Sequence, residues 1–508
     1  MGPISRWSSS KRLAMNGGKP FLKEGSMCVT SSRQRRKGGV SPVLPMKEKN
    51  TPYSVTILTM GCRVNQFETD LILKMGLDSG LHTTDSVDDA DIIIINTCSV
   101  TQESERQARK LIRRLGRDHP KARLVVTGCY AQRSPETFYN QPNVALVVGN
   151  QDKKRLWHLW DQNTLPKPCD HPLTEPAEPG NSDAGGIAAY GPILDHSENR
   201  ARTPLQIQDG CDRHCTYCLI PQVRGPSVSI HPDRIMAQAE RYLQAGSREL
   251  VLLGIDIGSF GRDLSPPWTL AQMVKALLPL CQTGRLRLSS VDPMDLDDEM
   301  MALFAPGSPL CPHLHLSIQS GDDLIRKRMG RQGSRQELLM RINQLRRINP
   351  HMVFGADLIA GFPTESDEAF ANTHSLIAEG GISLLHVFPY SQRPNTPAAR
   401  FPSHSLVPEP IVKQRASILR QAGQEQFNLR LKSRLLYPAD VLVEKVDGAW
   451  VQGTSEDYYS VRFINTLADI HGAMRRVDLT EFDPTQEMFL GVVPQVSTDL
   501  STGSVDKW

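Results

Sequence analysis

Residues 209–221 read DGCDRHCTYCLIP and place three cysteines, Cys211, Cys215 and Cys218, within eight residues. Three thiolates at this C-x3-C-x2-C spacing can wrap one cube-shaped iron–sulfur cluster, which usually takes four cysteine ligands. With three ligands one iron stays open, and an open iron can chelate a small molecule. Structural zinc is the alternative, but it needs a fourth ligand, and His214 lies awkwardly between the cysteines.

The residues around and after this loop alternate between apolar runs and helical stretches such as 231–246 and 335–350. Eight strand–helix units make a complete barrel, so six predict a partial (β/α)6 barrel with ligand groups at the carboxyl ends of its strands. The predicted strands are PLQIQ (204–208), RELVLLGID (248–256), RLRLSSVD (285–292), HLHLSIQSG (313–321), VFGADLIAGFP (353–363) and SLLHVFPYS (383–391).

The residues before the loop show a second alternation, typical of parallel strands buried on both faces of an open α/β sheet. The runs YSVTILTMGC, DIIIINTC and RLVVTGC end at Cys62, Cys98 and Cys129, and a helix is predicted over 102–117. Carboxyl ends of parallel strands meet at one edge, so the three thiols are expected to share an iron–sulfur or other soft-metal site. Three buried, inert thiols are the alternative.

The composition excludes several classes of protein. The 508 residues suggest three or four domains, and 39% hydrophobic residues exclude wholesale disorder. No apolar run approaches the ~20 residues of a membrane span, and ten cysteines are too few for a secreted disulfide scaffold of this length.

Charge is distributed unevenly along the chain. Residues 1–50 carry eleven Lys/Arg and two Glu, a formal charge of +9, which leaves −6 for the remainder. We predict a disordered basic extension there; a nucleic-acid-binding arm, or a natural start at Met46, are the alternatives. We further predict an interdomain linker at 161–203, a small all-β unit at 436–495 and a frayed tail at 496–508.

The two cysteine sets together resemble the radical S-adenosylmethionine (radical SAM) methylthiotransferases over about residues 52–495. The resemblance rests on TMGCRVNQFETD (59–70), INTCSVT (95–101), VVTGCYAQ (125–132) and GCDRHCTYCLIP (210–221). It implies an α/β protein with an N-terminal Rossmann-like domain, a radical SAM barrel and a TRAM-like barrel that binds RNA. These domains would cover 51–160, 204–435 and 436–495.

The resemblance also implies two [4Fe–4S] clusters. One, on Cys211, Cys215 and Cys218, would bind SAM and cleave it to a 5′-deoxyadenosyl radical; the other, on Cys62, Cys98 and Cys129, would carry the sulfur that a second SAM methylates. Tyr217 matches an aromatic residue that typically lies near the adenine of SAM. The predicted strand ends carry further candidates for SAM binding, each with an alternative role in a turn: Gly254, Asp256, Ser317, Gln319, Ser320, Asp357, Gly361 and Tyr390. In LGIDIGSFG, Asp256 replaces the family's usual Asn-like residue.

Within the family, GCRVNQFET, GCYAQ and VFPYSQRPNTPAAR look most like the MtaB group. That resemblance implies 2-methylthiolation of N6-threonylcarbamoyladenosine at position 37 in the anticodon loop of tRNA. The same chemistry on N6-isopentenyladenosine or on a ribosomal-protein aspartate is the alternative. A non-catalytic iron–sulfur RNA-binding protein and a zinc-bound nucleic-acid module represent other classes.

The implied partners are tRNA, a one-electron reductant such as a flavodoxin or ferredoxin, and a sulfur source, in the cytoplasm and without a membrane. RNA contacts are expected from the basic segment 106–117 and from Trp450, Tyr458, Tyr459 and Arg462. Cys28, Cys169, Cys281 and Cys311 fit neither set and are interpreted as ordinary thiols.

Overall fold

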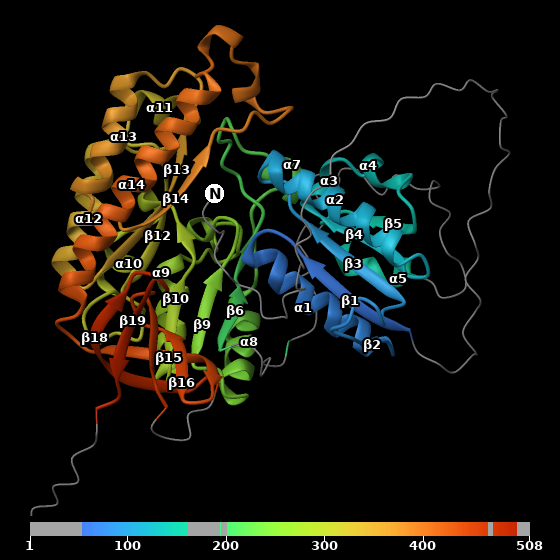
Figure 1. Cartoon of the computed structure of the whole chain (residues 1–508), viewed down its shortest axis with the longest axis horizontal. Helices are drawn as coiled ribbons and strands as arrows, with labels where there is room; N and C mark the ends of the chain where they lie inside the picture. Colours follow the sequence, from blue (N-terminus) through green and yellow to red (C-terminus); the bar gives the residue numbers. More distant parts are fainter. Residues whose placement is uncertain (1–52, 161–193, 195–200, 466–470, 495–508) are drawn as a thin grey trace, which may run out of the picture.

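The computed structural model describes residues 53–160, 194, 201–465 and 471–494. The predicted extension at 1–50, the tail at 496–508, Cys28, Cys169 and nearly all of the predicted linker lie outside the described residues. Figure 1 shows an N-terminal α/β domain beside a larger barrel domain, with a small C-terminal β-barrel below the larger one.

The N-terminal domain contains the predicted open parallel sheet, which runs in the order β2-β1-β3-β4-β5. Its central strand β3 (Ile92–Thr97, IIIINT) is buried along its whole length, as a strand covered on both faces requires. The other strands are β1 (Ser54–Thr59), β2 (His82–Thr83), β4 (Arg123–Gly128) and β5 (Val144–Val148).

Helices cover both faces of this sheet. The predicted helix at 102–117 is α2 (Gln102–Asp118), which Thr101 caps by accepting a hydrogen bond from the Ser104 backbone N–H. Ile112 and Leu115 are buried against the sheet, and most of the charged residues, Glu105 excepted, lie on the opposite side. The other helices are α1 (Arg63–Asp78), α3 (Cys129–Arg133), α4 (Glu136–Tyr139) and α5 (Leu156–Leu159).

The six predicted barrel strands are present as parallel strands in two sheets, ordered β10-β9-β6 and β11-β12-β13-β14. The run at 285–292 is interrupted at Ser289, so that β10 belongs to the first sheet and β11 to the second. The strands are β6 (Arg202–Gln206), β9 (Glu249–Leu253), β10 (Arg285–Leu288), β11 (Ser290–Val291), β12 (His313–Gln319), β13 (Val353–Ala360) and β14 (Leu384–Pro389).

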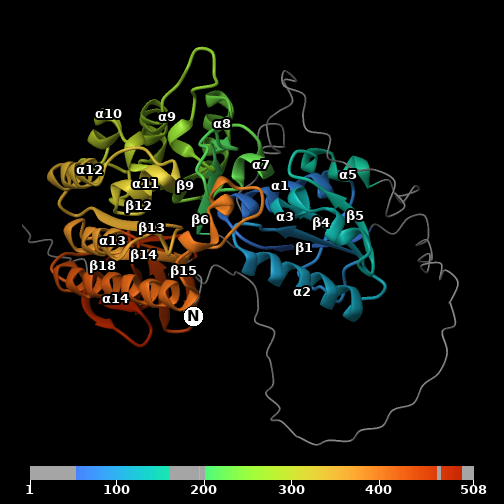
Figure 2. The same ribbon diagram turned by 90° about the horizontal axis from the view of Figure 1, so that it is seen from above.

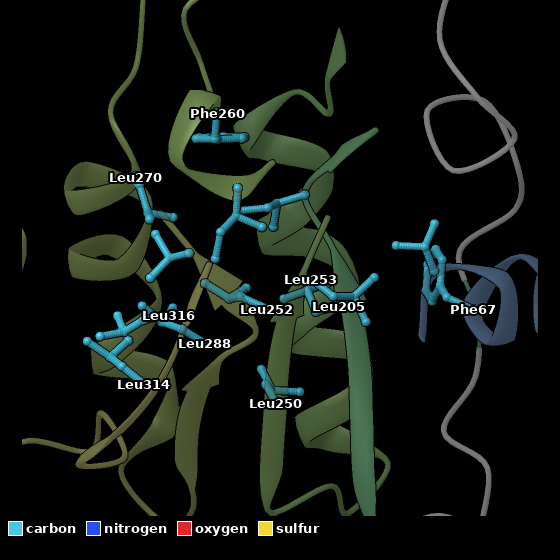
Figure 3. Close-up of a cluster of buried hydrophobic side chains, with 14 of the residues drawn as sticks. Phe67, Leu205, Leu250, Leu252, Leu253, Phe260, Leu270, Leu288, Leu314 and Leu316 are labelled. Carbon is cyan, nitrogen blue, oxygen red and sulfur yellow. The ribbon is translucent and has the colours of Figure 1, made fainter. Parts of the chain in front are cut away.

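Figure 2 shows helices lining the outer side of these strands. Figure 3 shows buried side chains of the barrel domain, with Leu205 of β6 on the side that faces Phe67 of the N-terminal helix α1. One apolar cluster therefore runs from the N-terminal domain into the barrel. The helices are α7 (Ile220–Arg224), α8 (Pro232–Gln244), α9 (Leu270–Leu277), α10 (Asp298–Ala302), α11 (Asp323–Met329), α12 (Arg335–Ile348), α13 (Asp367–Glu379) and α14 (Glu409–Arg434).

The predicted C-terminal all-β unit is a closed barrel in the order β15-β16-β17-β19-β18. Closure leaves no unpaired strand edge, and the core is filled by residues such as Val441, Val451 and Phe489. The strands are β15 (Ala439–Asp447), β16 (Trp450–Thr454), β17 (Ser460–Ile464), β18 (Met474–Asp483) and β19 (Met488–Val492).

A buried cluster of charges attaches this module to the base of the larger barrel. Arg285 and Arg287 both pair with the fully buried carboxylate of Glu249. Their remaining guanidinium nitrogens donate to backbone carbonyls of the C-terminal module, those of Asp440, Thr454, Ser455 and Glu456. Burial alone would raise the pKa of the Glu249 carboxyl, but Arg285 and Arg287 lower it below its ordinary value.

No helix among the described residues is both long enough and apolar enough to cross a bilayer.

We expect Glu249→Gln to destabilise the protein by about 3–5 kcal/mol, because it leaves two buried guanidiniums without their counter-charge. The measurement is the midpoint of urea unfolding at pH 7. Asp447→Asn, which removes the exposed Lys445–Asp447 pair, is the control and should leave the midpoint nearly unchanged.

The same carboxylate gives a pH dependence. Its folded-state pKa is depressed, so its contribution is complete above the ordinary glutamate pKa of about 4.3 and is lost as the pH falls below that value. The wild type should therefore lose more stability than Glu249→Gln between pH 5 and pH 3. Equal losses would show that the pair contributes nothing.

Candidate active site

The loop that carries Cys211, Cys215 and Cys218 lies beyond the carboxyl end of β6, between the short strand β7 (Gln208–Asp209) and helix α7. β7 pairs with β8 (Val228–Ser229), and this pairing closes the base of the loop. Gly210 has a φ of +68°, and a Cβ added there would lie 1.8 Å from the carbonyl oxygen of Pro226. The loop can turn this tightly only with glycine at that position.

Nitrogen–hydrogen groups point at all three sulfurs of this loop. The backbone N–H groups of Arg213 and Ile220 donate to the Sγ atoms of Cys211 and Cys218 at 3.3 and 3.4 Å. The guanidinium of Arg331 approaches the Cys215 Sγ at 3.7 Å. Such donors stabilise thiolates, and hydrogen bonds to sulfur tune iron–sulfur clusters, so these surroundings fit a cluster.

Without a metal, the surroundings of Cys211 and Cys218 favour the protonated thiol. Burial, assisted by the nearby Asp256 carboxylate, raises the pKa of Cys211 to about 12, and burial raises the pKa of Cys218 to about 11. Metal loading would therefore release protons.

The second set of thiols lies at the carboxyl edge of the N-terminal sheet. Cys98 and Cys129 directly follow β3 and β4, and Cys129 is the first residue of α3. Cys62 follows β1 after Met60 and Gly61 and is the N-cap of α1. Gly61 lets the first loop lie against the second, because a Cβ there would be 2.7 Å from the Cys98 Sγ. The three thiols therefore lie at one edge of the N-terminal sheet.

Cys98 and Cys129 are buried, whereas Cys62 is exposed. Burial raises the pKa of Cys98 to about 12. Within the described residues, only His315, Asp357 and His386 bring three metal-ligating atoms within 4.8 Å of one another. A single zinc ion has Zn–S bonds of about 2.3 Å and so requires its ligand atoms to lie close together. The sulfur atoms of neither cysteine set lie that close to one another.

Two asparagines connect the two cysteine sets, and the sequence analysis missed both. The side-chain amide of Asn150 donates to the Cys129 Sγ at 3.4 Å and to the Val223 carbonyl of α7 at 2.8 Å. The Cys62 thiol donates to the Asn65 Oδ1 at 3.8 Å, and Arg224 of α7 donates to that oxygen at 2.7 Å. Asn150 follows strand β5, so its place at a strand end was a signal in the sequence.

Charged residues hold this arrangement in place. Arg224 is completely buried and pairs with Glu68 of α1 and Asp209 of β7, and Lys153 pairs with the same Glu68. The helix after the first cysteine loop is therefore fixed to the helix after Cys62.

Most residues predicted to bind SAM lie near the first cysteine loop. Asp256, beyond β9, accepts from Arg213 at 2.8 Å and from the Cys211 thiol at 3.7 Å. The Ser317 carbonyl accepts from Arg331, and Gln319 ends β12 with a φ of +70°. Gly254 follows β9, Gly361 follows β13, and Tyr217 and Tyr390 both pack edge-on against Phe362.

Two of the strand-end candidates differ from the expectation, Asp357 in its position and Ser320 in its contacts. Asp357 was placed at a strand end, but it lies in the middle of β13, where it contacts His315 and His386. Ser320 is buried and bonds to Thr373 of α13, which is a packing role.

Tyr458 and Tyr459, which were expected to contact RNA, both make packing contacts inside the protein. Tyr459 is buried in the core of the C-terminal barrel. Tyr458 points toward the larger barrel, where it stacks on His313 with ring centroids 4.6 Å apart and accepts a hydrogen bond from Arg63. Among these candidates, Trp450 is 38% exposed, and Arg462 lies 4.3 Å from the centre of its ring.

Cys281 and Cys311 lie buried in the barrel domain, away from both sets. Burial raises the pKa of Cys281 to about 12 and that of Cys311 to about 11.

Two protein families match separate parts of this chain. Residues 54–149 match the uncharacterized protein family UPF0004, and residues 205–377 match the radical SAM superfamily. Among solved structures, the radical S-adenosylmethionine methyltransferase TsrM from Kitasatospora setae is 12% identical, with a TM-score of 0.49 over 68% of this chain and 74% of that chain.

Curated relatives match nearly their full length. The threonylcarbamoyladenosine tRNA methylthiotransferase MtaB of Rickettsia prowazekii is 41% identical over 76% of this chain and 87% of the relative. The tRNA-2-methylthio-N(6)-dimethylallyladenosine synthase of Bartonella quintana is 33% identical over 78% of this chain and 88% of the relative. The chain thus belongs to the radical SAM methylthiotransferase family and, within it, to the MtaB group.

Proposed function

We propose that this enzyme converts N6-threonylcarbamoyladenosine at position 37 of tRNA to its 2-methylthio derivative. The observation that carries the proposal is the pair of three-thiol sets, the second of which is joined by Asn65, Asn150 and Arg224 to α7, the helix that follows the first. Sulfur insertion and methyl transfer need two reactive centres that open onto one substrate. The choice of substrate follows the higher identity to a relative named for threonylcarbamoyladenosine.

Cys211, Cys215 and Cys218 would hold one [4Fe–4S] cluster, and Cys62, Cys98 and Cys129 an auxiliary one. A cluster and SAM bound at the first set supply one-electron chemistry that can attack an unactivated aromatic C–H bond. Arg331 and the backbone N–H groups of Arg213 and Ile220 steady the first set of thiolates. Asn150 donates to Cys129 in the second set.

Tyr217, Gly254, Asp256, Ser317, Gln319 and Gly361 form the proposed SAM-binding surface. A one-electron reductant and a sulfur source complete the reaction. We place the reaction in the cytoplasm, where thiols stay reduced. The target base must leave the anticodon-loop stack to enter the site.

The C-terminal barrel would supply an RNA contact. Trp450 offers a half-exposed ring next to the Arg462 guanidinium. An aromatic face beside a cation suits an unpaired base and its phosphate.

Nucleoside analysis of tRNA tests the substrate. We expect cells that lack this protein to lose 2-methylthio-N6-threonylcarbamoyladenosine and to accumulate the unmethylthiolated form. Re-expression of the wild type should restore the product. A loss confined to methylthiolated isopentenyladenosine would assign the enzyme to the other tRNA substrate, and an unchanged tRNA profile would contradict a tRNA-modifying function.

Single-cysteine variants test the two sets. We expect Cys215→Ala to abolish 5′-deoxyadenosine formation from SAM, and Cys98→Ala to retain some of it while losing methylthiolation. Both products are measured by mass spectrometry after anaerobic reconstitution, together with iron and sulfide content. Cys281→Ala is the matched control, because Cys281 is buried outside both sets. Full methylthiolation by Cys98→Ala would refute the auxiliary site.

The RNA contact is tested by binding. We expect Trp450→Ala to weaken tRNA binding roughly tenfold, since stacking of one base contributes about 1–3 kcal/mol. The dissociation constant is measured by fluorescence anisotropy. Leu436→Ala removes an apolar side chain that is 82% exposed but has no ring, and should leave affinity unchanged. Equal affinities for all three proteins would exclude stacking on Trp450.

A further inference from the structure

Three ionisable side chains from neighbouring strands meet in the second sheet of the barrel. His315 of β12 contacts the Asp357 Oδ1 through its Nε2 at 2.9 Å, and His386 of β14 contacts the same oxygen through its Nδ1 at 3.3 Å. The two imidazole rings lie 4.6 Å apart. We refer to His315, Asp357 and His386 as the polar triad.

The triad lies on the inner face of the sheet. Leu314 and Leu316, which flank His315, are fully buried in the apolar core, so His315 points to the opposite face. In β14, Val387 is buried and its carbonyl accepts from Arg420 of α14, whereas His386 and Phe388 are exposed. Gly355 makes room for the imidazole, because a Cβ there would be 2.6 Å from the His315 Nδ1.

The contacts made along β12 show how far the triad lies from the cysteine loop and from the base of the barrel. Ser317, two residues beyond His315, accepts from Arg331, which also contacts the Cys215 thiol. His313, two residues before His315, stacks on Tyr458 at the base of the barrel. At about 3.3 Å per residue, His315 lies roughly 7 Å below the level of the cysteine loop and roughly 7 Å above the base.

Two side chains of the triad are accessible to solvent, so a ligand can reach them. The His386 side chain is 58% exposed and the Asp357 side chain 22% exposed. Burial alone would raise the pKa of the Asp357 carboxyl, but His315 and His386 lower it, so Asp357 is ionised at neutral pH. Phe388, two residues beyond His386 on the same face, exposes 40% of its surface and provides an apolar wall for an aromatic base.

We propose that the polar triad is the subsite that recognises the threonylcarbamoyl group of the substrate adenosine. This inference rests on the proposed function. The group carries ureido N–H donors, a hydroxyl and a carboxylate. Asp357 accepts from an N–H or O–H of the group, His386 donates to its oxygens, and His315 positions Asp357.

The same chemistry rejects an apolar substituent. An isopentenyl group would displace water from Asp357 and His386 without replacing the hydrogen bonds. A site built to bond polar groups discriminates strongly against analogues that lack them, because its own polar groups are left unpaired. The triad would thus determine which modified adenosine is methylthiolated.

The test uses reconstituted full-length enzyme and two anticodon stem–loop RNAs, one with N6-threonylcarbamoyladenosine and one with N6-isopentenyladenosine. We expect His386→Leu to lower kcat/KM for the first RNA by about 10–100-fold, the effect of losing one charge-assisted hydrogen bond. SAM cleavage without RNA should stay within about twofold. His386→Gln, which keeps a donor, should recover part of the loss.

His374→Leu on the exposed face of α13 is the control and should match the wild type. If the wild type modifies the threonylcarbamoyl RNA and His386→Leu does so equally well, the subsite is refuted while the proposed function stands. If the wild type modifies only the isopentenyl RNA, the proposed function fails first. A stoichiometric metal other than iron, present in the wild type and lost in His386→Leu, would make the triad a metal site and overturn the proposal.

Discussion

The ion pairs around Arg224 determine how the N-terminal domain docks against the larger barrel domain. The guanidinium is completely buried and pairs with Glu68 and Asp209, while Lys153 also reaches Glu68. Burial alone would raise the pKa of the Glu68 carboxyl, but the two cations lower it. Buried charges are costly to desolvate and tolerate only geometries that pair them, so this cluster selects one docking orientation. Both cysteine sets depend on that orientation.

A second junction connects all three modules through one tyrosine. Tyr458 enters the base of the larger barrel from the C-terminal module and lies against three arginines, Arg63, Arg202 and Arg287. Burial alone would raise the pKa of its hydroxyl, but these arginines lower it. Arg63 directly follows Cys62, so the C-terminal module contacts the residue next to Cys62. This contact gives the C-terminal module a structural role in the N-terminal site as well as a proposed one in RNA binding.

The sequence was most informative where chemistry and periodicity coincide. Uninterrupted Val/Ile runs that end in cysteine predicted both the parallel sheet and the edge at which Cys62, Cys98 and Cys129 meet, because strand direction fixes that edge. Side-chain partners across domains were not predictable in this way. Asn65 and Arg224 are 159 residues apart in the chain, and Asn150 and Val223 are 73 apart. Neither pair has a local pattern that would reveal it.

Asp357 shows a different limit of sequence interpretation. The run VFGADLIAGFP was correctly identified as a strand, but the strand extends through Ala360, and Asp357 is therefore inside it. An ionised carboxylate in mid-strand needs partners on the same face, and these come from β12 and β14.

Formal charge was a poor guide to RNA binding, and the use of arginine in this fold explains why. Arg287, Arg326 and Arg434 are among the largest fully buried side chains, and Arg224 is also internal. These residues neutralise buried acids or bond to backbone carbonyls, as Arg326 does with Ile318, and they add little to the field outside the protein. A count of Lys and Arg therefore overstates the positive surface over 53–494. Recognition of a polyanion must therefore depend on basic groups that stay at the surface, such as Arg462 beside Trp450, more than on net charge.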